Sequence, residues 1–232
     1  MWKLHRASQT LPLSSKRTAI ILAGGESSRF RSNKALGLLA GKPLVCHVVE
    51  RLSRIADETL VVIGRHERRA DYEVVLPSSA KVMNDSHEGK TPLIGIVTGL
   101  QATRSDYALV CACDVPFVNE GVVELLFRRA SGADAAIPRW TGGRIEPLES
   151  VYRVVSTLKA AQETLAPSGL PLRVMIGRLA QVEYVSVEDE IREVNPDLRT
   201  FFNVNSMKDL ETAEQVLSKG ISPDGASLVQ DK

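Results

Sequence analysis

Residues 19–34 read AIILAGGESSRFRSNK, and this stretch decides the fold. The apolar run Ala19–Ala23 is typical of a short buried strand, and it passes directly into two glycines, hydroxyl side chains and then Arg29 and Lys34. Glycines let backbone N–H groups come close to an anion, while Arg and Lys supply charge for phosphate oxygens. The pattern is neither a Walker loop nor G-x-G-x-x-G. It nevertheless predicts a phosphate-binding loop at the end of a strand.

Apolar runs of strand length alternate with helical patterns along the rest of the chain. Further strands are predicted at Thr59–Ile63, Lys81–Met83, Tyr107–Cys113, Ala133–Pro138, Leu148–Tyr152, Glu183–Val187 and Phe201–Val204. Helices are predicted between them, among them one that Pro92 opens. This alternation indicates an α/β fold, a Rossmann-like three-layer arrangement with a mostly parallel sheet and a small antiparallel part that includes Leu148–Tyr152.

The ends of the chain differ in composition from its middle. We expect residues 1–17 to be a disordered N-terminal extension and residues 218–232 to be a flexible C-terminal tail, because both stretches lack apolar periodicity. Residues 18–217 are then a single domain. No apolar run reaches the roughly 18 residues that a membrane-spanning helix needs, and no secretory signal is recognisable. The cytoplasm is the expected compartment.

Charge and cysteine content exclude several classes of protein. The chain has 29 basic and 28 acidic residues, a net charge of +1, whereas nucleic-acid and membrane-surface binding need a basic excess. We therefore expect neither nucleic acid nor membrane as a partner. Its three cysteines, Cys46, Cys111 and Cys113, form no C-x-x-C pair and no disulfide framework. They are expected to be small buried apolar side chains.

Polar residues follow three of the predicted strands. They are the Gly24 loop, Asp85 and Asp114, and they should converge because ligands of parallel sheets bind beyond the carboxyl ends of the strands. Asp114 ends a strongly apolar strand, so it should meet a cation, and Mg²⁺ takes one or two carboxylates together with substrate phosphates. The alternative is a helix cap or turn at Asp114. Phosphates with Mg²⁺, and no nucleophile motif, indicate transfer at phosphorus.

Asp85 and two asparagines have alternative interpretations. Asp85 could bind the nucleotide ribose or could cap an Asx turn. Asn203 and Asn205 alternate at the end of the predicted strand Phe201–Val204, which would place both amides on one side for a neutral heterocycle. The alternative is that they cap the helix that begins near Ser206.

These motifs together resemble the molybdenum cofactor guanylyltransferases, the MobA family of nucleotidyltransferases. The resemblance covers residues 18–217, and its opening L-A-G-G-x-S-x-R…K loop is shared with cytidylyl and sugar-nucleotide transferases. More specific are the later motifs, which are Asp85-Ser86, Thr91-Pro92-Leu93-Ile94-Gly95, Cys113-Asp114-Val115-Pro116-Phe117, Leu172-Arg173-Val174-Met175 and Phe202-Asn203-Val204-Asn205.

The resemblance implies a reaction in which GTP and molybdopterin, with its metal, give the guanine dinucleotide cofactor and pyrophosphate. It also implies roles for individual residues. Leu22, Ala23 and Gly24 would hold the nucleotide through their backbone, with Gly25 in the same binding loop. Lys34 would neutralise phosphate charge as pyrophosphate leaves, Asp85 would lie on the nucleotide side, Asp114 would hold Mg²⁺, and Asn203 and Asn205 would lie toward the pterin. Lys34, Asp114 and the phosphate-clamping Arg29 are the predicted catalytic residues. Proteins of molybdopterin synthesis or molybdoenzyme maturation are candidate partners.

Three positions depart from the family's usual pattern. Arg31 stands where a glycine is usual, and Asn33 stands where an aspartate is usual. Gly64, after the strand Thr59–Ile63, stands where the family often has an asparagine that contacts guanine. These departures bear on base specificity more than on reaction type. The alternatives are a related transferase of the molybdopterin cytidylyl or sugar-phosphate type and a non-catalytic nucleotide-binding regulator.

Overall fold

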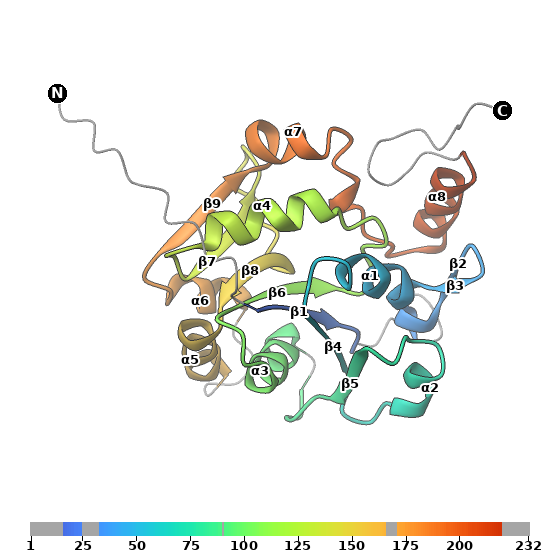
Figure 1. Cartoon of the computed structure of the whole chain (residues 1–232), viewed down its shortest axis with the longest axis horizontal. Coiled ribbons are helices and arrows are strands. Elements are labelled where there is room, and N and C mark those ends of the chain that lie inside the picture. Colours follow the sequence, from blue (N-terminus) through green and yellow to red (C-terminus); the bar gives the residue numbers. More distant parts are fainter. Residues whose placement is uncertain (1–15, 25–32, 90, 166–170, 220–232) are drawn as a thin grey trace.

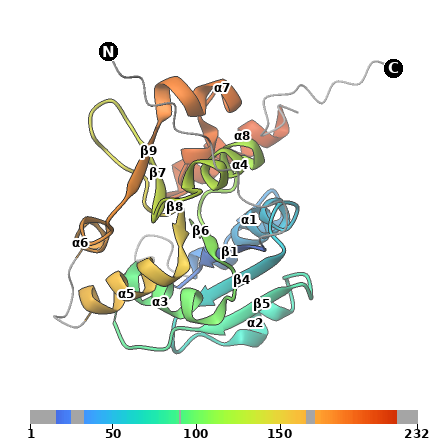
Figure 2. The ribbon, with the colours of Figure 1, turned by 60° about the vertical axis from the view of Figure 1, so that its left-hand side comes forward.

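The computed structural model describes residues 16–24, 33–89, 91–165 and 171–219. Within these residues a seven-stranded sheet has the order β5-β4-β1-β6-β8-β7-β9. Figure 2 shows it running from β9 at one edge to β5 at the other. Its strands are β1 (Arg17–Leu22), β4 (Glu58–Ile63), β5 (Ala80–Asn84), β6 (Tyr107–Ala112), β7 (Ala135–Arg139), β8 (Glu149–Arg153) and β9 (Val182–Ser186). A second, two-stranded sheet pairs β2 (Leu38–Leu39) with β3 (Lys42–Pro43) in antiparallel fashion.

The strand directions put several carboxyl ends at one edge of the sheet. β1 pairs in parallel with both β4 and β6, and β4 pairs in parallel with β5. β8 is antiparallel to its neighbours β6 and β7, which confirms the antiparallel strand expected near Leu148–Tyr152. The loops after β1, β4, β5 and β6 therefore all emerge on the same side.

Helices cover both faces of the sheet (Figure 1). One face carries α3 (Pro92–Ala102), α5 (Val154–Leu165) and α6 (Leu172–Gly177), and the other carries α1 (Leu44–Leu52) and α4 (Glu120–Ala130). The shorter helices are α2 (Arg69–Glu73), a π-helical turn (Val187–Ile191) that continues into α7 (Arg192–Val194), and 3-10 turns at Lys34–Leu36 and Arg199–Phe201. The last described helix is α8 (Met207–Ser218). In the part of the chain described here, no helix combines the length and apolar character of a membrane span.

The central strand β1 is buried on both faces, which explains its continuous apolar sequence. Ile20 packs in the cluster with α3 and α5, whereas Ile21 packs in the cluster with α1 and α4. Successive side chains of a strand point to opposite faces, and burial of each such side chain contributes about 1.5–3 kcal/mol. Two cores therefore hold β1 in the middle of the molecule and fix the place where its loop begins.

One strand prediction was wrong. Phe201–Val204 does not pair with the sheet; a 3-10 turn ends at Phe201, and the next residues are extended without a strand partner. Phe202 instead packs on Phe117, with ring centroids 5.8 Å apart. The backbone N–H of Val204 donates to the carbonyl of Asp114 over 2.9 Å. The alternating pattern reflects these contacts rather than a sheet ladder.

The expected domain limits, 18 and 217, lie within the described residues. β1 begins at Arg17 and α8 ends at Ser218, next to the limits predicted at 18 and 217. Of the terminal segments predicted at 1–17 and 218–232, residues 1–15 and 220–232 lie outside the described residues. Cys46, Cys111 and Cys113 are all buried and unbridged, as their sequence context predicts.

Candidate active site

A pocket of about 1410 Å³ opens at the carboxyl ends of β1, β4, β5 and β6. Gly24, Asp85 and Asp114 all line it, so the three strand ends singled out in the sequence do converge. Leu22, Ala23, Lys34 and Asn205 line it as well. Gly25 and Arg29, the other two predicted site residues of the loop, lie outside the described residues.

Gly24 allows the ends of β1 and β4 to touch. A Cβ at Gly24 would lie 2.6 Å from the backbone nitrogen of Gly64, which is too close for any side chain. The N–H groups of Ala23 and Gly24 both donate to the carbonyl of Val62, at 2.8 and 3.1 Å. The first glycine of the loop thus closes the floor of the pocket by backbone packing, with its own N–H directed at β4.

Lys34, Asp114 and Asn205 form a polar cluster on the β6 side of the pocket. Lys34 Nζ donates to Asp114 Oδ2 over 2.5 Å and to Asn205 Oδ1 over 2.7 Å. The Lys34 and Asp114 side chains are only 14% and 16% exposed, so the pair is partly shielded from solvent. A shielded ammonium held by two oxygen acceptors has a fixed position, as phosphate neutralisation requires.

The second oxygen of Asp114 has a different environment. Asp114 Oδ1 is buried and accepts no hydrogen bond within the described residues. An uncompensated carboxylate oxygen is costly, so this oxygen fits a cation that arrives with the substrate. The described residues contain no cluster of three or more potential metal-ligating side chains. One carboxylate together with phosphate oxygens is a common ligand set for Mg²⁺, and Asp114 suits it.

Asp85 also presents a buried oxygen without a partner among the described residues. The pKa of its carboxyl is raised to about 6, mainly by burial and additionally by the negative charge of Glu67. Gly95, in the first half of α3, lets the helix approach: a Cβ there would lie 3.5 Å from Asp85 Oδ1 and 2.9 Å from Leu22 Cδ2. Asp85 is thus an acceptor held against the pocket wall, as hydroxyl binding requires.

The two asparagines of the C-terminal motif lie in different environments. Asn205 lines the pocket and binds Lys34, whereas the amide of Asn203 donates to the carbonyl of Phe201 over 2.9 Å and does not line the pocket. The helix cap belongs to neither, because Ser206 caps α8 through the Asp209 N–H. The prediction that both amides share one side fails because the segment is not a strand.

Three charged residues that line the pocket, Arg65, Glu67 and Glu88, were not predicted as site residues. The carboxylate of Glu67 accepts hydrogen bonds from the Asn33 amide, over 2.7 Å, and from the Tyr72 hydroxyl. Asn33 also donates to the Tyr72 oxygen over 2.7 Å and caps the turn that carries Lys34. The only available signals were the unusual Asn33 and Gly64, and neither indicated which acidic residue would come near.

A family model described as a MobA-like NTP transferase domain matches residues 19–182. A probable molybdenum cofactor guanylyltransferase of Methanosarcina acetivorans is 38% identical over 205 residues, which cover 84% of this chain and 89% of that protein. A molybdenum cofactor guanylyltransferase of Desulfosudis oleivorans is 31% identical over 205 residues, covering 88% and 96% of the two chains.

A solved structure gives the same picture of the fold. The crystal structure of molybdopterin-guanine dinucleotide biosynthesis protein A from Archaeoglobus fulgidus superposes with a TM-score of 0.75 at 30% identity. The match covers 88% of this chain and 99% of that one. The structural similarity therefore extends over most of both chains.

Proposed function

Because the chain belongs to the MobA-like NTP transferase family, we propose that it transfers GMP from GTP to molybdopterin, with release of pyrophosphate. The product is the guanine dinucleotide form of the molybdenum cofactor. The observation that carries the proposal is the shielded Lys34–Asp114 pair in a pocket of about 1410 Å³, in which a buried carboxylate oxygen of Asp114 has no partner among the described residues.

The reaction needs no nucleophile from the protein. An oxygen of the terminal phosphate of molybdopterin attacks the α-phosphorus of GTP, and a new P–O bond forms there. The bond from the α-phosphorus to the oxygen that bridges to the β-phosphate breaks, and its electrons leave with pyrophosphate. Catalysis then consists of aligning two anions and neutralising their charge.

Lys34 and Asp114 supply the two parts of that neutralisation. The ammonium of Lys34, held by Asp114 and Asn205, lies where phosphate oxygens would collect negative charge. Asp114 Oδ1 would hold Mg²⁺, which would supply charge neutralisation and polarisation of the phosphorus centre. Arg29 and Gly25 complete the proposed phosphate loop. Leu22, Ala23, Gly24 and Asp85 form the nucleoside side, and Asn205 faces the acceptor.

The direct test is pyrophosphate release from GTP and Mg²⁺ with molybdopterin as acceptor. We expect the wild-type protein to release one pyrophosphate per dinucleotide formed, and Asp114→Asn to lose turnover by about 10²–10³-fold while keeping its unfolding transition. Binding of GTP without pyrophosphate release in the presence of molybdopterin would instead favour the nucleotide-binding regulator.

We further propose that the reaction takes place in the cytoplasm and that proteins of molybdoenzyme maturation receive the product.

A further inference from the structure

Charged side chains line the pocket along the order of its strands. Lys34 and its partner Asp114 lie where β6 ends, whereas Arg65 and Glu67 follow β4 and Asp85 and Glu88 follow β5. Carboxylates accept hydrogen bonds and donate none, so the acids after β4 and β5 offer acceptors to a ligand part that donates. Because the phosphates of a nucleotide suit the Lys34 side, its nucleoside half falls on the β4–β5 side. The inference below rests on the proposed function in this respect.

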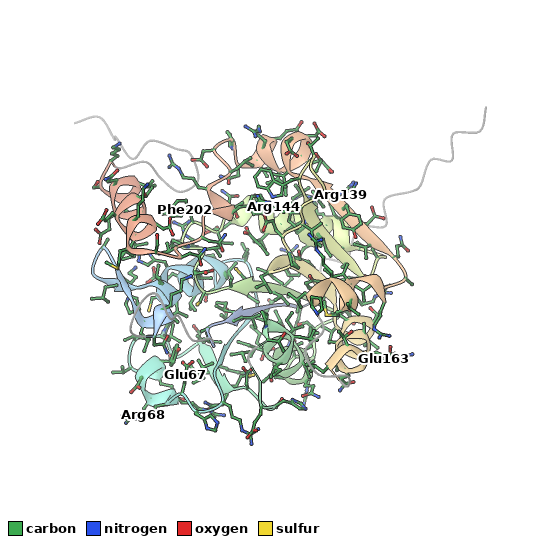
Figure 3. The ribbon with its side chains drawn as sticks, turned by 180° about the vertical axis from the view of Figure 1, so that it is seen from behind. Glu67, Arg68, Arg139, Arg144, Glu163 and Phe202 are labelled. Atoms are coloured by element: carbon green, nitrogen blue, oxygen red, sulfur yellow. The ribbon has the colours of Figure 1, made fainter. Side chains whose placement is uncertain are left out.

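Glu67 fills space that a side chain at position 64 would occupy. A Cβ added to Gly64 would lie 2.7 Å from Glu67 Oε1, so the carboxylate lies directly beside the backbone at the end of β4. In Figure 3 Glu67 lies on the inner side of its segment, whereas its neighbour Arg68 points outward. The side chain of Glu67 thus occupies the part of the pocket wall that a side chain at position 64 would otherwise fill.

The two oxygens of Glu67 are held differently. Oε2 accepts from the amide of Asn33 over 2.7 Å and from the hydroxyl of Tyr72, whose side chain is buried. Within the described residues Oε1 accepts one long hydrogen bond, from the N–H of Gly64 over 3.3 Å. The first oxygen is therefore fixed by its partners, and the second keeps capacity for a donor that enters the pocket.

We propose that Glu67 is the residue that selects guanine, through Oε1, which accepts a hydrogen bond from the 2-amino group. Among the common nucleobases only guanine has a second donor, N1–H, beside its amino group, so that no lone pair of the base faces the carboxylate. The amino groups of adenine and cytosine adjoin a ring nitrogen whose lone pair would face the same carboxylate. A site that hydrogen-bonds a substrate group discriminates strongly against analogues that lack it.

Asn33 and Gly64, which both depart from the family's usual pattern, both suit a carboxylate at position 67. Asn33 supplies an N–H to Glu67, whereas an aspartate there would bring a second carboxylate within hydrogen-bond distance and repel it. Gly64 leaves the room that the Glu67 carboxylate needs. Both substitutions thus favour a carboxylate at this point of the pocket. The charge of Glu67 also contributes to the raised pKa of Asp85, and the two carboxylates line the same pocket.

The test compares GTP with inosine triphosphate, which keeps N1–H but lacks the 2-amino group. Dissociation constants of both, with Mg²⁺, are measured by isothermal titration calorimetry for the wild type and for Glu67→Gln. We expect the wild type to bind GTP at least ~10-fold more tightly than inosine triphosphate, as loss of a hydrogen bond to a charged acceptor implies. In Glu67→Gln the preference should fall to within about threefold.

Glu73→Gln is the matched control, because Glu73 is an exposed carboxylate in α2 outside the pocket. It should keep the wild-type preference. The preference is a ratio measured within one variant, so a smaller folded fraction does not change it. If Glu67→Gln does not fold, Glu67→Asp retracts the carboxylate and should lower the preference in the same way.

Wild-type preference in the folded Glu67 variants would overturn the assignment. This outcome is separate from failure of the proposed function. A chain that binds GTP selectively through Glu67 but transfers no GMP to molybdopterin would contradict the reaction and leave the base selection intact.

Discussion

Lys34 concentrates the positive charge on the β6 side of the pocket, and its replacement should mainly affect chemistry. Lys34→Met removes the ammonium that binds Asp114 and Asn205 but keeps a side chain of similar length. We expect kcat for pyrophosphate release to fall by about 10²–10³-fold, because charge stabilisation in the transition state is lost. Steady-state kinetics with GTP and molybdopterin measure this change.

Lys42→Met is the corresponding control, since Lys42 forms an ion pair with Glu50 (2.7 Å) at the surface and does not line the pocket. Exposed pairs contribute about 0–1 kcal/mol to stability, so this variant should keep both its kcat and its unfolding midpoint. A Lys34→Met protein with wild-type kcat would remove Lys34 from the mechanism.

Asp85 predicts a pH dependence of nucleotide binding. Burial raises the pKa of its carboxyl to about 6, so the group is protonated below that pH and loses acceptor capacity for ribose hydroxyls. GTP affinity should therefore fall as the pH drops through about 6. Titrations of wild type and Asp85→Asn between about pH 5 and pH 7.5 measure this. Protonation of GTP itself affects both proteins equally, so the difference between their curves isolates Asp85.

The effect of Asp85 ionisation on folding stability has the opposite sign to its effect on GTP affinity. Folding favours the protonated form of Asp85 because the pKa is higher in the folded protein, so this contribution is present at low pH and is lost as the pH rises through about 6. Asp85→Asn should raise the unfolding free energy at neutral pH by about 1–2 kcal/mol, a value reduced for the partial exposure of the group. An unchanged pH profile of GTP affinity in Asp85→Asn would contradict the role in binding.

The N-terminus of α8 holds Asn205 in the pocket. Ser206 Oγ accepts from the Asp209 N–H over 3.2 Å, and Asp209 Oδ2 accepts from the Asn205 N–H over 2.9 Å. Asp209→Ala should cost about 1 kcal/mol of unfolding free energy, as loss of a cap does. It should also lower kcat severalfold, because Asn205 no longer holds Lys34 in one position. Urea unfolding and turnover measure the two effects.

Glu211→Ala provides the comparison within the same helix, because Glu211 is exposed and makes none of these cap contacts. It should change kcat by less than about twofold. If Asp209→Ala destabilises the protein but leaves kcat at the wild-type value, the cap has a structural role only.

A buried carboxylate, that of Glu149, connects the central sheet to two segments that are distant in the sequence. Glu149 of β8 is 3% exposed and accepts a hydrogen bond from the hydroxyl of Thr200. The same hydroxyl accepts from the N–H of Asn119, ahead of α4, over 3.1 Å. The sheet, the N-terminus of α4 and the segment that leads to Asn205 therefore meet at Glu149.

Burial raises the pKa of Glu149 well above its usual value. Folding thus favours the protonated form, and its contribution to stability is full below the unfolded pKa and is lost as the pH rises. Glu149→Gln should remove a slope of up to about 1.4 kcal/mol per pH unit. Unfolding by urea across acidic to neutral pH measures it, with the exposed Glu124→Gln as control. Identical pH profiles for wild type and Glu149→Gln would show that Glu149 does not titrate differently on folding.

Much of the fold could be predicted because it depends on local patterns. The apolar runs of β1 and β6 identify buried strands, and the Pro92 signal places the start of α3 correctly. Phe201–Val204 was misassigned because alternation is also produced by contacts with Phe117 and with the Asp114 carbonyl. A strand requires a partner edge, which a local sequence pattern does not reveal.

Some residues of the candidate site could also be predicted from local patterns and topology, whereas others could not. Convergence of Gly24, Asp85 and Asp114 follows from parallel topology, because each ends a strand of the same sheet. Glu67 could not be predicted, because it reaches the pocket through Asn33 and Tyr72, and Asn33 is 34 positions away in the chain. Hydrogen-bond networks of this kind depend on tertiary packing rather than on spacing.

The most direct test of guanylyl transfer offers the protein equal concentrations of GTP, CTP, ATP and UTP with molybdopterin and Mg²⁺, and identifies the products by mass spectrometry. We predict the guanine dinucleotide as the main product, formed together with pyrophosphate and lost in Asp114→Asn. A cytosine dinucleotide as the main product, or no dinucleotide from any of the four nucleotides, would contradict the assignment.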